Sequence, residues 1–174
     1  NGDERIAIDF SDAAELAKKA GNAAKGLRAQ NAAMWKALRP QGIFYQTGAA
    51  PKTAFLYTGQ GSQYVNMLET LRETEPIVAD VIAEADRTME PVLGQPLSAY
   101  IYADATDEEA FNAADGELRR TEITQPAVLT VDAALTALLA AYGIHPNMVM
   151  GHSLGEYGAL EAAGALPFTD ALEA

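Results

Sequence analysis

The feature that most constrains this chain is a short apolar run followed at once by a glycine-flanked serine. Residues 148–150 are apolar and β-prone, and residues 151–155 read G-H-S-L-G before a helix-forming stretch. A serine at a tight turn between strand and helix is a nucleophile elbow, because the turn pushes the hydroxyl out to where substrate can reach it. The two glycines leave room for the turn, and a helix starting at Leu154 aims free backbone N–H groups at Ser153. The pattern predicts an α/β fold with a reactive serine.

A second glycine-rich turn lies near the start of the larger part of the chain. Residues 53–57 form a β-prone run, and residues 58–63 read T-G-Q-G-S-Q. A strand that ends in a polar turn flanked by glycines can present backbone N–H groups, which would supply the second half of an oxyanion hole. The same pattern also fits a plain connection from strand to helix.

Together the two motifs resemble the acyltransferase family, which comprises malonyl-CoA:acyl carrier protein transacylases and the acyltransferase domains of polyketide and fatty-acid synthases. That family carries G-Q-G-S-Q near its start and G-H-S-x-G-E further on, and here Gln60 and Ser153 are 93 residues apart. Residues 121–127, T-E-I-T-Q-P-A, are similar to a third family block, with Gln125 lying 28 residues before the serine. Residues 55–68 look most like iterative multidomain synthases of polyketides or polyunsaturated fatty acids.

The resemblance implies acyl transfer, with malonyl as the acyl group, from coenzyme A to an acyl carrier protein in polyketide or fatty-acid biosynthesis. Ser153 would form an acyl-serine intermediate, while the backbone N–H groups of Gln60 and Leu154 hold the oxyanion. A coenzyme A thioester is then the substrate and the phosphopantetheine thiol of the carrier the acceptor, with no permanently bound cofactor and no metal. In modular relatives an apolar residue at the position of Leu154 accompanies malonyl. The resemblance also implies a neighbouring ketosynthase domain and a cytoplasmic location.

The general base that a serine nucleophile needs is not evident in the two histidines of this chain. His152 is next to the serine on the turn, where the backbone directs its side chain away from the hydroxyl, and His145 falls in a loop. In the family, the catalytic histidine, an arginine for the substrate carboxylate and a small ferredoxin-like subdomain come later, so we expect all three after Ala174. We therefore expect the isolated chain to be inactive or to turn over only slowly. Glu161 departs from the family, which usually has an apolar residue there.

Two other functions remain open from the residues alone. A serine hydrolase or thioesterase shares the elbow, although the G-Q-G-S-Q turn and the Gln125-Pro126 pair are not expected in it. A non-catalytic docking or scaffold fragment is the second alternative, and residues 1–52 fit that role.

Composition and charge exclude some classes and divide the chain. Cysteine is absent, which excludes disulfides and a thiol nucleophile, and the net charge of −12 argues against a nucleic-acid partner. Residues 1–52 hold eight Lys/Arg and five Asp/Glu, a net of +3, whereas residues 53–174 hold four and nineteen, a net of −15. This uneven distribution of charge predicts two units. The first, over residues 1–50, is expected to be a small α+β unit that resembles the linker between ketosynthase and acyltransferase. Residues 51–174 would then be the N-terminal part of an acyltransferase domain.

Local patterns predict the elements of both units. The larger unit should contain a mostly parallel sheet with an α/β-hydrolase-like nucleophile elbow, and the ferredoxin-like subdomain should be absent from this chain. The apolar stretch 126–144 contains Asp132 and has helical periodicity, so we expect a buried helix and no membrane partner. The predicted strands are 5–10, 53–57 and 148–150. The predicted helices are 12–26, capped by Asp12; 31–38; 65–72; one capped by Thr74, with Ile77, Val78 and Ile82 on its apolar side; one capped by Thr106; 126–142, with Tyr142 among its buried residues; 154–163; and one from Thr169.

Overall fold

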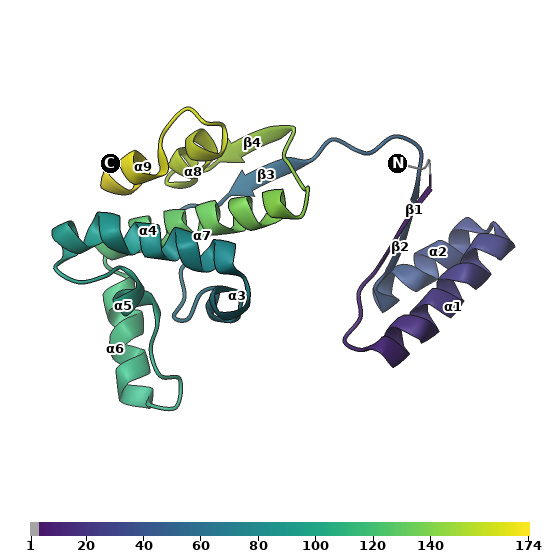
Figure 1. Cartoon of the computed structure of the whole chain (residues 1–174), viewed down its shortest axis with the longest axis horizontal. Coiled ribbons are helices and arrows are strands. Elements are labelled where there is room, and N and C mark those ends of the chain that lie inside the picture. The colour runs from purple at the N-terminus through teal and green to yellow at the C-terminus, as the bar shows by residue number, and fades with distance from the viewer. Residues whose placement is uncertain (1–3) are drawn as a thin grey trace. The chain divides into compact units, whose positions relative to one another are not determined.

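The computed structural model describes residues 4–174 and divides the chain into two compact units, Asn1–Pro51 and Lys52–Ala174 (Figure 1). Their boundary falls in the turn-rich segment 47–52. Each unit has a sheet and a hydrophobic core of its own, as expected of a separately folded body.

The N-terminal unit packs helices on a two-stranded antiparallel sheet. Strand β2 was missed by the sequence analysis; it forms because pairing with β1 places Ile43 at 0% exposure against Leu38 and Ala23. The first strand and both helices were predicted correctly to within a few residues. The elements are β1 (Glu4–Ile8), α1 (Ala13–Ala29), α2 (Ala32–Leu38), the 3₁₀ turn η1 (Arg39–Gln41) and β2 (Ile43–Thr47).

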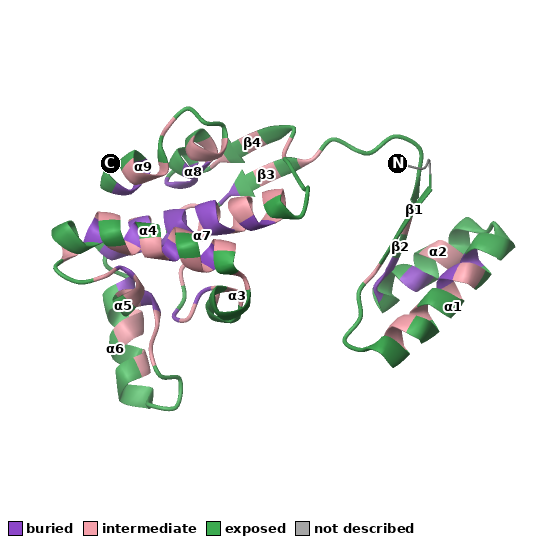
Figure 2. Cartoon of the chain, in the orientation of Figure 1, coloured by how far each residue is buried: buried purple, intermediate pink, exposed green. Residues whose placement is uncertain are grey.

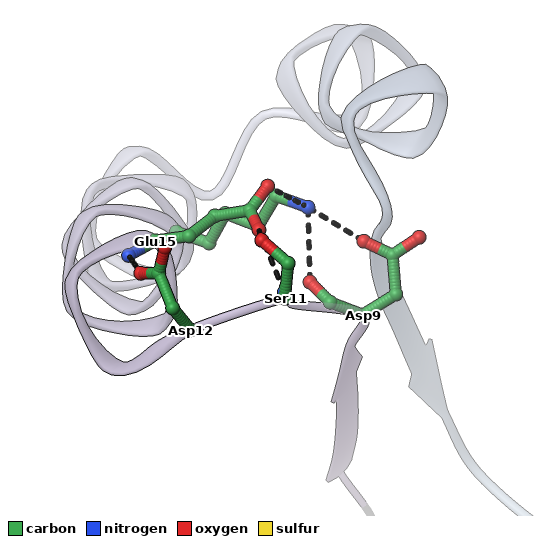
Figure 3. A network of polar contacts seen from close by, with 5 residues as sticks. Asp9, Ser11, Asp12 and Glu15 are labelled. Atoms are coloured by element: carbon green, nitrogen blue, oxygen red, sulfur yellow. Dashed lines mark hydrogen bonds and ion pairs between the residues drawn. The ribbon is translucent and has the colours of Figure 1, made fainter.

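Helix α1 begins with a dense polar network (Figure 3). The Asp12 carboxylate accepts a hydrogen bond from the Glu15 N–H at 2.8 Å, which confirms the predicted N-cap. Glu15 in turn accepts from both the backbone N–H and the hydroxyl of Ser11, each at 2.7 Å. These Ser11 bonds, with a further one from Lys19, lower the pKa of Glu15 to about 2. The network satisfies donors that a helix start otherwise leaves unpaired.

The C-terminal unit is built around one long helix and two parallel strands. Strands β3 and β4 pair in register, with Ala54 beside Met148 and Tyr57 beside Gly151. The elements are β3 (Ala54–Tyr57), α3 (Glu69–Thr74), α4 (Pro76–Leu93), α5 (Ser98–Ile101), α6 (Glu108–Leu118), α7 (Thr121–Ala141), β4 (Met148–Gly151), α8 (Gly155–Ala162) and α9 (Phe168–Glu173).

Helix α7 carries most of the core of this unit, and Figure 2 shows buried residues along its length. By length and composition α7 is apolar enough to cross a membrane, and 56% of that stretch is buried inside the structure. It begins at Thr121 rather than at Pro126, which lies inside the helix. Tyr142, predicted to be buried, is 68% exposed and donates from its hydroxyl to Glu75. Because α7 begins earlier than predicted, the T-x-x-x-Q-P-A block forms the first turns of this helix.

Two predicted helix starts in this unit are wrong. The helix expected over residues 65–72 begins only at Glu69, because Asn66 and Leu68 adopt positive φ angles of 65° and 58°. Thr74 does not cap α4: it ends α3, and its hydroxyl donates to the Thr70 carbonyl at 2.7 Å. Helix α4 instead begins with a proline, whose fixed φ suits the first turn.

The predicted cap at Thr106 is also wrong, by one residue. Asp107 caps α6 by accepting from the Ala110 N–H at 3.0 Å. Thr106 instead donates from its N–H and its hydroxyl to Asp104, at 2.8 and 2.7 Å. Aspartate is the better N-cap here, because its charge adds to the hydrogen bond at the positive end of the helix.

Candidate active site

The predicted elbow is present between β4 and α8. Ser153 has a φ angle of 54°, in the left-handed region, which costs a non-glycine residue about 1 kcal/mol. Two backbone hydrogen bonds close the turn, from the Gly155 N–H to the His152 carbonyl and from the Glu156 N–H to the Ser153 carbonyl, both at 3.0 Å. Strain of this kind at one polar residue, held by the surrounding structure, is typical of a reactive site.

Both glycines of the elbow are required by close packing. A Cβ atom at Gly151 would overlap the backbone carbonyl of Gly155. A Cβ atom at Gly155 would overlap the carbonyl of Tyr57 and lie 2.8 Å from that of Thr58. The start of α8 therefore packs directly on the backbone of β3 and β4. A side chain at Gly151 or Gly155 would prevent this close packing.

The glycine-rich turn after β3 lies against the elbow. A Cβ atom at Gly59 would stand 3.1 Å from the His152 carbonyl oxygen and 3.8 Å from the Ser153 Cβ. The turn is braced from within, since the Ser62 hydroxyl donates to the Gly59 carbonyl at 3.1 Å. The two motifs, 93 residues apart in the sequence, thus form one site.

Several backbone N–H groups at this site have no hydrogen-bond acceptor among residues 4–174, and those of Gln60 and Leu154 are among them. The neighbouring Gly61 N–H, by contrast, donates to the Gln63 side chain at 2.8 Å. Free N–H groups on rigid turns beside a serine are the donors that stabilise an oxyanion. Sequence reasoning named these two groups, and the structure brings their segments together.

The third sequence block joins the same site through α7. The Gln60 side chain donates to the Thr121 hydroxyl at 3.1 Å, which ties the glycine-rich turn to the first residue of the block. Gln125 and Leu154 share a cleft of about 610 Å³, whose wall also includes Tyr157. A volume of this order suits a small-molecule ligand. Sequence reasoning missed the Thr121 contact, because it placed the start of α7 after this residue.

Neither histidine forms a hydrogen bond to the serine hydroxyl. His152 lies over the glycine-rich turn, with its Nδ1 atom 3.1 Å from the position of a Cβ at Gly59. His145 is exposed in the loop before β4. In the described part of the chain the Ser153 hydroxyl has no hydrogen-bond partner, and no group of three or more His, Cys, Asp or Glu residues is placed to hold a metal ion.

One titratable residue near the elbow was missed as a functional candidate. Asp132 of α7 was noted only because it interrupts an apolar stretch, yet it contacts α8. Burial, together with the charge of Glu161, raises the pKa of Asp132 to about 7. Burial also raises the pKa of Glu161 itself. The sequence did contain a signal for this candidate. Asp132 is a lone acid on the apolar face of a helix, and Glu161 is a second acid at a position where the family usually has an apolar residue.

Comparison with known proteins identifies a family that this chain matches. A family model described as "Acyl transferase domain" matches residues 54–174. Polyketide synthase GfsA of Streptomyces halstedii is 37% identical over 123 residues, which are 71% of this chain and 2% of the synthase. The malonyl CoA-acyl carrier protein transacylase of Bacillus subtilis is 41% identical over 121 residues, 70% of this chain and 34% of the transacylase. The chain thus spans about a third of that transacylase and far less of the synthase.

A solved structure shows the same fold. The acyl transferase domain of ZmaA superposes with a TM-score of 0.68 at 31% identity, over 76% of this chain and 30% of that one. The predicted α/β class, with parallel strands and a serine elbow, is thereby confirmed.

Proposed function

The chain belongs to the acyl transferase domain family, and we propose that it transfers malonyl from coenzyme A to an acyl carrier protein in polyketide or fatty-acid biosynthesis. Ser153 attacks the thioester carbonyl, coenzyme A leaves as its thiol, and a malonyl-serine ester remains. The phosphopantetheine thiol of the carrier then attacks the ester and regenerates the serine. The names of the Bacillus subtilis and Streptomyces halstedii relatives support the acyl group, the acceptor and the pathway.

The contact between the Gly59 turn and Ser153 carries this proposal. The N–H groups of Gln60 and Leu154 belong to the two backbone segments that meet at this contact. In both acylation and deacylation a negative charge develops on the carbonyl oxygen, and two such donors stabilise that charge without reorganisation. The elbow alone would serve any serine acyl-enzyme, whereas the added G-Q-G-S-Q turn and the T-x-x-x-Q-P-A block resemble the blocks of this family.

The N-terminal unit and the partner domains are a further part of the proposal. We assign the Asn1–Pro51 unit to a linker that joins a ketosynthase domain to the acyltransferase, because it folds on its own sheet and lies outside the family match at residues 54–174. The apolar side chain of Leu154 supports malonyl as the acyl group.

Labelled malonyl-CoA tests the reaction against hydrolysis. In single-turnover incubations lasting hours, the label should appear on the peptide that contains Ser153 and should then move to the thiol of added holo-carrier protein. Apo-carrier protein, which lacks the phosphopantetheine arm, is the matched control and should accept nothing. Release of free malonate at the same rate with and without holo-carrier would identify a hydrolase instead.

The chain alone should form the acyl-serine slowly. Neither histidine forms a hydrogen bond to the Ser153 hydroxyl, and a general base contributes about 10²- to 10⁴-fold, so the rate should fall below that of the Bacillus subtilis transacylase by that order. His145→Ala and His152→Gln should each change the rate less than about twofold, well below the general-base contribution. A large loss in His152→Gln alone would make His152 the base and contradict this expectation.

A further inference from the structure

Asp132 lies where three elements of the site meet. A Cβ atom at Gly158 of α8 would stand 3.0 Å from the Asp132 Oδ2 atom and 3.1 Å from the Tyr57 ring of β3. The Asp132 carboxyl group on α7 therefore lies against α8, close to the point where α8 packs on the Tyr57 ring of β3. A negative charge on this carboxyl group would act on the contact between α7 and α8.

The carboxyl group has no compensating partner. Among residues 4–174 the buried Asp132 Oδ2 atom has no hydrogen-bond partner, and no Lys or Arg forms an ion pair with it or with Glu161. From α8 the titratable group facing it is Glu161, and from β3 it is Tyr57. Strand β4 carries no titratable side chain, and α4 meets α7 through apolar residues. A buried charge left unpaired in this way is costly.

A hydrogen-bond chain links α7 to β3. The Thr136 hydroxyl donates to the Asp132 carbonyl at 2.7 Å, so the Tyr57 hydroxyl must donate to Thr136, at 2.9 Å. Tyr57 is the last residue of β3 before the turn that holds Gln60, and α8 begins directly after Leu154. Asp132 is thus linked through its backbone carbonyl to the strand that leads to Gln60, and its carboxyl group contacts the helix that follows Leu154.

We propose that Asp132, kept protonated beside Glu161, acts as a positioning residue that holds β3 and α8 together, so that the Gln60 and Leu154 N–H groups converge beside Ser153. Loss of that proton leaves two like charges across the contact between α7 and α8, and they push the helices apart. Glu161 lies in the last turn of α8, where the helix dipole also disfavours a negative charge. The proposal rests on the proposed function only for its effect on acyl transfer.

The dependence of stability on pH follows from the direction of the shift. The pKa of Asp132 in the folded chain, about 7, is above its ordinary value of 3.8, so the folded state holds the proton more tightly. The stabilisation from this group is fully present below pH 3.8 and is lost as the pH rises through about 7. Above that pH the folded chain carries the unpaired charge.

Thermal unfolding of the 174-residue chain at pH 6.0 and pH 8.5 tests the proton held by Asp132 without any assay of activity. The melting temperature of the wild type should fall by several degrees more than that of Asp132→Asn, which is neutral at both pH values and nearly the same shape. Asp80→Asn, at an exposed position of α4, is the matched control and should follow the wild type. Parallel curves for wild type and Asp132→Asn would overturn the proposal.

Two further measurements separate the effect of Glu161 and the positioning role from a merely structural role. The NMR titration midpoint of the Asp132 carboxyl carbon should move to lower pH in Glu161→Gln, because the like charge has gone; an unchanged midpoint would refute the influence of Glu161. The rate of Ser153 acylation by malonyl-CoA should fall above pH 7 relative to Asp132→Asn, and identical profiles would refute positioning. If neither protein is acylated at any pH while the unfolding curves differ, the proposed function fails and the positioning role fails with it, but the bound proton on Asp132 stands.

Discussion

Ser153→Ala is expected to abolish the incorporation of label from malonyl-CoA, lowering it by at least about 10⁴-fold, because removal of the nucleophile leaves no oxygen to form the acyl ester. The measurement is mass spectrometry of the elbow peptide after a long single-turnover incubation. Covalent label that persists in the alanine variant would show that another residue is acylated.

A second substitution at the same position separates lost chemistry from lost folding. Ser153 has positive φ, which alanine tolerates no better than serine and glycine tolerates without penalty. Ser153→Gly should therefore unfold at a temperature equal to or above that of Ser153→Ala, while both remain unlabelled. Label on the glycine variant would exclude Ser153 as the nucleophile, whatever the stability of that variant.

Gly155→Ala is expected to lower the free energy of unfolding of the Lys52–Ala174 unit by about 3 kcal/mol or more, because the new Cβ overlaps the Tyr57 carbonyl and rigid backbone cannot move aside. For a unit of this size the melting temperature should fall by about 10 °C. Acylation should fall as well, since the clash separates α8 from β3 and with them the two N–H donors. Calorimetry and the labelling assay together check both effects.

Gly116→Ala is the matched control for this substitution. Gly116 lies inside α6 of the same unit, and a Cβ atom there would meet nothing within 4 Å. Alanine should therefore raise the free energy of unfolding by about 0.5 to 1 kcal/mol, by its better helix propensity. Equal destabilisation by both substitutions would mean that the tight packing at Gly155 is not the cause.

The sequence by itself determined the parts of the site that depend on neighbouring residues. The spacing of Gly151, Ser153 and Gly155 predicts the elbow because backbone sterics over five residues decide it. The Asp12 cap and the apolar side of α4 followed in the same way, from short-range hydrogen bonding and helical period. The order of three motifs was specific enough to indicate the family before any fold was known.

Only the tertiary structure decided which distant residues meet. Strand β2 forms through pairing with a strand some forty residues earlier, and the Gly59 turn reaches Ser153 because β3 and β4 lie parallel in one register. Local propensity contains no information on such pairings, which are selected by the surface they bury. The charge state of Asp132 is also decided by tertiary structure. Its sequence neighbours predict an ordinary pKa, and only burial against α8 and β3 raises that pKa and favours the protonated form.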